Sequence, residues 1–272
     1  MFSVSRIYSG VSHITDAMGV SFTLIEGNEK AVLFDTGYGT ENVAEYVRML
    51  TDRPVKVLLS HGHHDHVLGA RWFGKTYLCK EDMDEFSERT GELQRRKVMQ
   101  QAEERGILLP ADFLYAPIIM PEPIRFTEKT GEFDSTKELL GSLEINVIRV
   151  PGHTPGSIVI FIPAYRMLLT GDDWNPCTWM WFPSSLNVRI WRNNMISLIR
   201  ELEDEYKTEI TGIICSHQSM VREGSELKRF LAYMTDERLD RAQAVDMGTE
   251  IKTHQVLKEP EGWTLVFDSN KK

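Results

Sequence analysis

The sequence has few of the features that mark secreted or membrane-spanning proteins. Its 272 residues include only three cysteines, and their spacing shows no pairing pattern, so reduced thiols are expected rather than a disulfide framework. No apolar run approaches the ~18 residues that span a bilayer. The N-terminal MFSVSRIYSG also lacks the apolar core of a signal peptide. These absences predict a cytoplasmic protein with no membrane partner.

Basic residues are also scarce relative to acidic ones. The net charge of −9 argues against DNA or RNA as the main partner, because such binding usually relies on Lys and Arg to neutralise phosphates. The chain is long enough to bury a sizeable core, and its 42% hydrophobic and 26% charged residues are ordinary for a globular protein. Composition therefore favours no nucleic-acid partner and leaves the function open.

Short apolar and β-branched runs alternate with longer helical patterns along the chain. Strands interleaved with helices are typical of the α/β class. The helical patterns cover 41–50, 81–105, 187–207 and 224–243. The predicted strands cover 20–27, 30–37, 55–60, 75–80, 143–152, 157–163, 166–173 and 211–217.

Histidine is distributed very unevenly. Four of the eight histidines fall within residues 61–66, HGHHDH, directly after the apolar run VKVLLS. His153 in VPGHTPGS and His217 in CSHQ also follow predicted strands, and Asp172 ends the run RMLLTGDD. Six of the eight histidines therefore lie where a strand gives way to a loop, and such a cluster seldom lacks a metal-binding or catalytic role.

Neutral imidazole and carboxylate groups suit a borderline divalent ion, with zinc favoured and manganese or iron as alternatives. His61 and His63, two residues apart on an extended loop, can turn their rings to one centre. Asp65 and His66 lie further round the turn and can serve a second centre. A catalytic ion takes about three protein ligands and keeps a position for water, so one turn cannot supply two ions. The distant candidates are His153, Asp172 and His217.

Taken together, these motifs resemble the metallo-β-lactamase superfamily. The matching residues are HGHHDH at 61–66, DTG at 35–37, His153 in PGHTPGS, Asp172 in LLTGDD and His217 in CSHQ. The resemblance runs from about residue 4 to residue 217. It implies an α/β fold with a four-layer αβ/βα sandwich of two similar halves, in a single domain over residues 1–272. The charged and proline-rich segment 81–135 is then expected to be a helical insertion over the active-site edge.

The resemblance also implies a dinuclear metal site with two divalent ions. By this likeness His61, His63 and His153 hold the first ion. Asp65, His66 and His217 hold the second, and Asp172 bridges both. An aspartate at the bridging position resembles the glyoxalase II and lactonase branches, whereas the antibiotic-hydrolysing lactamases usually carry cysteine there.

The chemistry implied is that of a metallo-hydrolase. A metal-bound hydroxide would cleave an ester, thioester, lactone or phosphoester of a small molecule. Asp65 is the expected catalytic residue, because it can accept a hydrogen bond from the nucleophile. Asp35 is expected to hold a ligand histidine or the loop backbone, with a simple turn-forming role as the alternative. Two other functions stay open, namely a mononuclear iron persulfide dioxygenase and a metal-binding protein without turnover.

The segment 174–183 directly follows the predicted bridging aspartate and holds three tryptophans, one methionine and one phenylalanine. Such a segment can line an apolar substrate pocket, pack the insertion against the core, or form a dimer contact. Trp174, Trp179 and Tyr38 are the candidate substrate contacts. A homodimer is one option for the oligomeric state, which the sequence leaves open.

Overall fold

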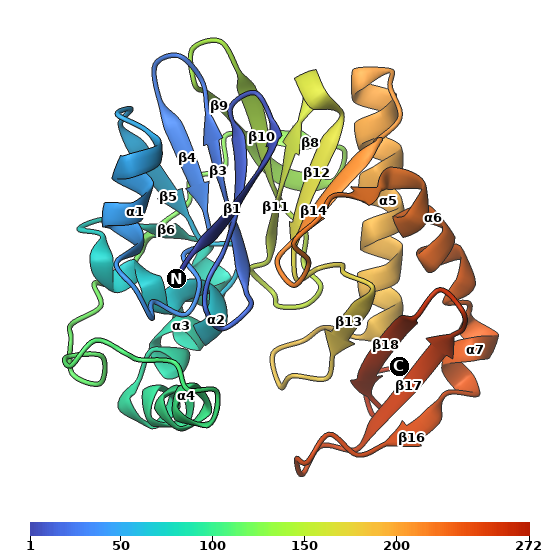
Figure 1. Cartoon of the computed structure of the whole chain (residues 1–272). Coiled ribbons are helices and arrows are strands. Elements are labelled where there is room, and N and C mark those ends of the chain that lie inside the picture. Colours follow the sequence, from blue (N-terminus) through green and yellow to red (C-terminus); the bar gives the residue numbers. More distant parts are fainter. The chain divides into compact units, whose positions relative to one another are not determined.

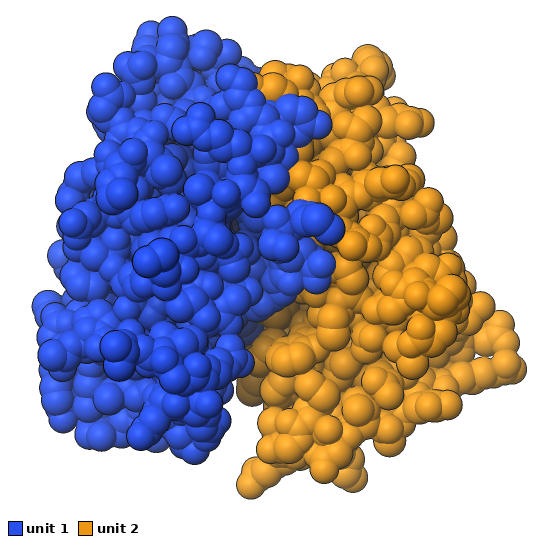
Figure 2. All heavy atoms as spheres, in the orientation of Figure 1, with its two compact units in different colours: residues 1–125, 137–145, 216–220 blue, residues 126–136, 146–215, 221–272 orange.

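Most of the longer strands lie in short apolar runs of the sequence. Figure 1 shows how the strands and helices follow one another along the chain. The computed structural model describes residues 1–272. Its chain divides into two compact units (Figure 2). Each unit has an apolar core of its own. Unit 1 comprises residues 1–125, 137–145 and 216–220, and unit 2 comprises residues 126–136, 146–215 and 221–272.

Unit 1 is built on a seven-stranded mixed sheet in the order β1 to β7. Strands β1 to β4 form an antiparallel meander, and β4 to β7 pair in parallel. Parallel strands end at the same edge of a sheet, so the residues after β4 and β5 lie together. The strands are β1 (Ser3–Tyr8), β2 (Val11–Thr15), β3 (Ser21–Glu26), β4 (Ala31–Phe34), β5 (Val55–Leu58), β6 (Tyr77–Leu78) and β7 (Glu122–Pro123).

The helices of unit 1 connect and flank the parallel strands. Helix α1 links β4 to β5, and the side chain of Asn42 caps its first turn by accepting a hydrogen bond of 3.0 Å from the backbone of Glu45. Phe22, Leu33 and Phe86 are among the residues of the apolar core. The helices are α1 (Val43–Leu50), α2 (His64–Val67), α3 (Met83–Arg89) and α4 (Glu92–Glu104), with 3₁₀ turns η1 (Leu68–Trp72) and η2 (Lys80–Asp82).

Unit 2 holds most of a second seven-stranded sheet and a smaller sheet of four strands. The larger sheet runs in the order β15-β14-β12-β11-β10-β9-β8, with β12 and β14 parallel, and the smaller in the order β13-β18-β17-β16. Residues 137–145, which hold the end of β9, the turn and the start of β10, belong to unit 1. The strands are β8 (Glu128–Thr130), β9 (Phe133–Leu139), β10 (Glu144–Arg149), β11 (Ile158–Ile162), β12 (Met167–Gly171), β13 (Cys177–Met180), β14 (Gly212–Cys215), β15 (Arg222–Glu223), β16 (Gln243–Val245), β17 (Thr253–Lys258) and β18 (Trp263–Asp268).

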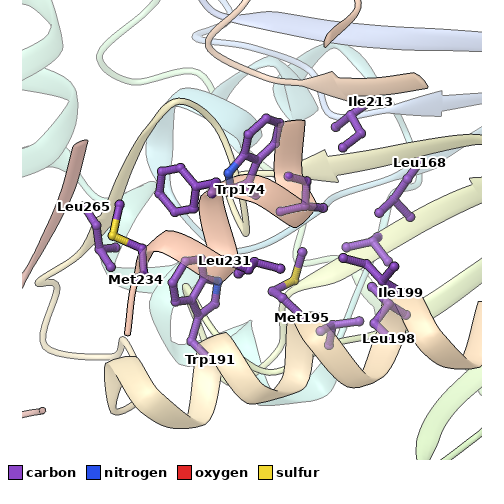
Figure 3. Packing of buried hydrophobic residues seen from close by; sticks show 14 of the residues in the cluster. Leu168, Trp174, Trp191, Met195, Leu198, Ile199, Ile213, Leu231, Met234 and Leu265 are labelled. Atoms are coloured by element: carbon purple, nitrogen blue, oxygen red, sulfur yellow. The ribbon is translucent and has the colours of Figure 1, made fainter. Parts of the chain in front are cut away.

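A long amphipathic helix, α5, supplies much of the core of unit 2. Its residues Trp191, Met195 and Leu198 are fully buried at helical spacing and gather with Trp174 and Leu231 in one apolar cluster (Figure 3). The helices of this unit are α5 (Val188–Tyr206), α6 (Gly224–Tyr233) and α7 (Asp236–Asp240), with a 3₁₀ turn η3 (Pro163–Tyr165).

The α/β class is confirmed, because each predicted strand range contains an observed strand and each helical pattern contains a helix. The segment 81–135 is helical only as far as Glu104, and β8 and the start of β9 take its last residues into the larger sheet of unit 2. No strand is predicted for ten of the observed strands, which are β1, β2, β7, β8, β9, β13, β15, β16, β17 and β18. None of the helices combines the length and the apolar character that crossing a bilayer requires.

Candidate metal centre

Asp35 lies at the end of β4, fully buried, with a left-handed φ of 70°. Aspartate is among the few residues other than glycine that adopt this backbone readily. Its carboxylate accepts hydrogen bonds from the backbone N of Ser60 (2.6 Å), from Ser60 Oγ (2.7 Å) and from Nδ1 of His66 (2.9 Å). Asp35 therefore joins the end of β4 to the loop that follows β5.

The same carboxylate also orients His61, through Ser60. Ser60 Oγ lies 2.9 Å from Nδ1 of His61, and its single proton is donated to Asp35. The hydroxyl must therefore accept from His61 Nδ1, which places the proton of that ring on Nδ1. The carboxylate of Asp35 can only accept a hydrogen bond, so the proton of His66 also lies on Nδ1. Nε2 is therefore the nitrogen of each ring that has a lone pair for a metal ion.

Helix α3 lies against the turn that carries the four histidines. The backbone N of Gly62 donates to Oδ2 of the buried Asp82 over 3.0 Å. A side chain at Gly62 would place its Cβ 2.9 Å from the backbone N of Phe86, so only glycine allows α3 to approach this closely. The turn is thus fixed by β4 on one side and by α3 on the other.

Glu85, on α3, contacts a third histidine and was not predicted from the sequence. Its Oε1 lies 3.3 Å from Nε2 of His63 and accepts a hydrogen bond of 2.7 Å from Nε of Arg89. Burial opposes ionisation, but the hydrogen bonds and charges of His63 and Arg89 hold the pKa of Glu85 at about 2. Glu85 thus stays ionised near neutral pH and orients the ring of His63 from its Nε2 side.

Three of the predicted ligands of the second ion meet within unit 1. Asp65, His66 and His217 each offer a ligand atom, and these atoms lie within 4.8 Å of one another. Oδ2 of Asp65 is 3.5 Å from Nε2 of His66 and 3.6 Å from Nε2 of His217. Burial acts to raise the pKa of Asp65, but the charges of the histidines and the hydrogen bond with His66 hold it well below its usual range. Asp65 is therefore a carboxylate, able to bind a cation or accept a proton.

Two further predicted ligands, His153 and Asp172, lie close together within unit 2. His153 Nδ1 donates to the backbone O of Trp179 over 2.7 Å, and its Nε2 lies 3.8 Å from Oδ2 of Asp172. The backbone N of His153 donates to Oδ1 of Asp173 over 2.9 Å. Asp173 thus holds the loop of His153.

The candidate substrate contacts differ in burial. Trp174 is 0% exposed and packs edge-on against Phe230 in the core of unit 2. The indole therefore packs in the core, and a substrate contact for Trp174 stays a prediction. Trp179 is 40% exposed on β13 and stays a candidate. Tyr38 packs edge-on against His64, with ring centroids 5.4 Å apart, and burial raises the pKa of its hydroxyl.

The donor set fits a divalent metal ion. His61, His63, His66 and His153 each have one ring nitrogen held by another group of the protein, and such partners orient metal-binding histidines and fix their tautomers. Imidazole and ionised carboxylate are the ligands that zinc, manganese and iron accept.

Comparison with known proteins agrees with the fold. The sequence model of the metallo-beta-lactamase superfamily matches residues 15–195, which is more than half of the chain. The protein belongs to the metallo-β-lactamase superfamily. A solved metallo-beta-lactamase from Pontibacter korlensis is 19% identical with a TM-score of 0.56, and the match covers 85% of this chain and 98% of that one. This likeness confirms the predicted fold.

Two curated relatives match part of the chain. The uncharacterized protein ML0493 of Mycobacterium leprae is 30% identical over 128 residues, 44% of this chain and 50% of the relative. The probable metallo-hydrolase YqgX of Bacillus subtilis is 22% identical over 152 residues, 53% of this chain and 61% of the relative. The matched part is thus about half to three fifths of the length of these relatives.

Proposed function

We propose that this protein is a metal-dependent hydrolase that cleaves an ester, thioester, lactone or phosphoester of a small molecule. The observation that carries the proposal is the buried Asp35, which orients two of the predicted ligand histidines, His61 and His66, at once. The membership of a superfamily whose members are generally hydrolases supports it.

We propose that the donors of the two units belong to one dinuclear centre, as the superfamily likeness implies. His61, His63 and His153 would hold one ion, and Asp65, His66 and His217 the other, with Asp172 shared. Zinc is the favoured ion. When bound, the ions would lower the pKa of water toward neutrality and polarise the substrate oxygen.

Side chains of the protein would orient the attacking water and the ligand histidines. The ionised Asp65 would accept a hydrogen bond from the attacking water and orient it toward the substrate. Asp35, Ser60 and Glu85 would keep the histidine rings in the tautomers that bind a cation. The aspartate at position 172 supports a relationship of this protein to the glyoxalase II and lactonase branches of the superfamily.

The proposal is tested with a panel of esters, thioesters, lactones and phosphodiesters, assayed with the protein as purified. Hydrolysis of one class is expected, with loss after chelation and recovery when zinc is restored. Oxygen uptake with a persulfide and one iron per chain would instead establish a dioxygenase. Metal-loaded protein that turns over none of these substrates would contradict the hydrolase proposal.

A further inference from the structure

Three aromatic side chains form a cluster on and just after β13, which we call the aromatic shelf: Trp179, Trp181 and Phe182. The rings of Trp181 and Phe182 are stacked, with centroids 4.5 Å apart and an interplanar angle of 22°. Trp179 lies 5.9 Å from Trp181 and 6.4 Å from Phe182, measured between ring centroids. The shelf is therefore one continuous apolar surface rather than three separate rings.

The shelf is attached directly to a predicted metal ligand. The backbone O of Trp179 accepts the hydrogen bond from Nδ1 of His153. The ring of Phe182 meets the ring of His153 edge-on, with centroids 5.3 Å apart. The shelf therefore reaches His153 at two points, the backbone of Trp179 and the ring of Phe182.

The chemistry of this segment is that of an uncharged apolar surface. Residues 174–188, WNPCTWMWFPSSLNV, contain no Lys, Arg, Asp, Glu or His. Trp179 is 40% exposed, while Met180, the next residue of the strand, is fully buried. The segment has no charged side chain of its own to form an ion pair with a phosphate or carboxylate, but it offers ring faces to a flat apolar group.

The backbone under the shelf is held at several points. Strand β13 pairs in parallel with β18, and Ser185 Oγ donates to the backbone O of His153 over 2.8 Å. The ammonium of Lys271 donates to three backbone oxygens of the loop, those of Phe182 (3.3 Å), Pro183 (2.6 Å) and Ser185 (2.8 Å). A recognition surface gains affinity when it is preorganised in this way, because less motion is lost on binding.

We infer that the aromatic shelf binds a flat, uncharged, apolar part of the substrate beside the bond that is cleaved. This inference rests on the proposed hydrolase function. It makes Trp179 a specificity-determining residue, with Trp181 and Phe182 as its support. The substrate would then be an aromatic or similarly flat apolar ester, thioester or lactone, and a charged group would have to lie elsewhere.

The test compares 2-naphthyl acetate with methyl acetate in the metal-loaded protein. Trp179→Ala is expected to lower the ratio of the two kcat/KM values at least fivefold, and Trp179→Phe, which keeps a ring, less than twofold. Leu257→Ala on β17 of the same sheet is the matched control, because Leu257 is 47% exposed and β18 separates its strand from β13. Its ratio should not change.

Binding of 2-naphthol, followed by calorimetry, separates this inference from the hydrolase proposal. Weaker binding to Trp179→Ala than to wild type supports the shelf even where no ester is hydrolysed. Equal binding, or an equal fall in kcat/KM for both esters, overturns it and leaves Trp179 with a structural role at His153. Trp181→Ala gives the same comparison if Trp179→Ala does not fold.

Discussion

The predicted ligands of the two units are oriented by different kinds of group. In unit 1, His63 and His66 contact the carboxylates of Glu85 and Asp35, and His61 reaches Asp35 through Ser60. In unit 2, His153 donates to the backbone O of Trp179. A carboxylate orients the ring and adds negative charge, whereas a backbone carbonyl orients it without net charge.

The two kinds of partner are therefore expected to affect different properties of the site. Buried negative charge behind a histidine raises its basicity and favours a bound cation. We therefore expect changes at the carboxylates of unit 1 to act mainly on metal affinity. Changes near His153 should affect the position of its ring and, through β13, the binding of the substrate.

The largest effect is expected from removing a ligand in either unit. Asp65→Ala and His153→Ala should each lower kcat by about 100-fold or more, because each removes a metal donor and Asp65 also orients the attacking water. Steady-state kinetics on a substrate found in the panel measures this. Near-wild-type turnover in either variant would show that the ligand assignment is wrong.

A smaller effect is expected at Asp35. Asp35→Asn should weaken zinc binding by about 10-fold to 100-fold, since groups behind metal ligands typically contribute this much. Asparagine tolerates the left-handed backbone, so the substitution changes the charge and the hydrogen bonds rather than the fold.

Competition with a coloured chelator measures the zinc affinity of this variant. Asp52→Asn is the control, because the side chain of Asp52 is 91% exposed and touches no ligand histidine. Equal affinity in Asp35→Asn and wild type would leave Asp35 with the turn-forming role alone.

The smallest effect is a pH dependence of stability at Glu85. Its pKa falls from 4.5 to about 2 on folding, so its ion pairs stabilise the folded protein above pH 4.5. That contribution should be lost as the pH falls from 4.5 toward 2. Urea unfolding of metal-free protein should show a weaker pH dependence over this window in Glu85→Gln than in wild type. The control is Glu88→Gln, because Glu88 is exposed on the same helix, and it should behave as wild type. The same pH dependence in both variants would show that Glu85 does not cause this change in stability.

The strands and the predicted metal ligands could be read from the sequence because each leaves a local signal. An apolar run followed by histidine or aspartate marks both a strand end and a candidate ligand, as in VKVLLSHGHHDH and RMLLTGDD. Asp35 was found by the same pattern, in AVLFDTG, although its link to His61 through Ser60 depends on the pairing of β4 with β5.

Other features of the site leave no such signal in the sequence. Glu85 is one of several acidic residues in EDMDEFSER, and only the packing of α3 on the histidine turn selects it. Trp174 and Trp179 belong to one aromatic segment, and their opposite burial follows from the path of the chain into β13. Lys271 lies far along the chain from the loop that it binds.

The most direct test of the proposed dinuclear centre is metal stoichiometry by elemental analysis of the purified protein. Two transition-metal ions per chain are expected in wild type, and fewer in both His66→Ala and His153→Ala, because one removes a donor of unit 1 and the other a donor of unit 2. Wild-type protein without a stoichiometric transition metal would contradict the account.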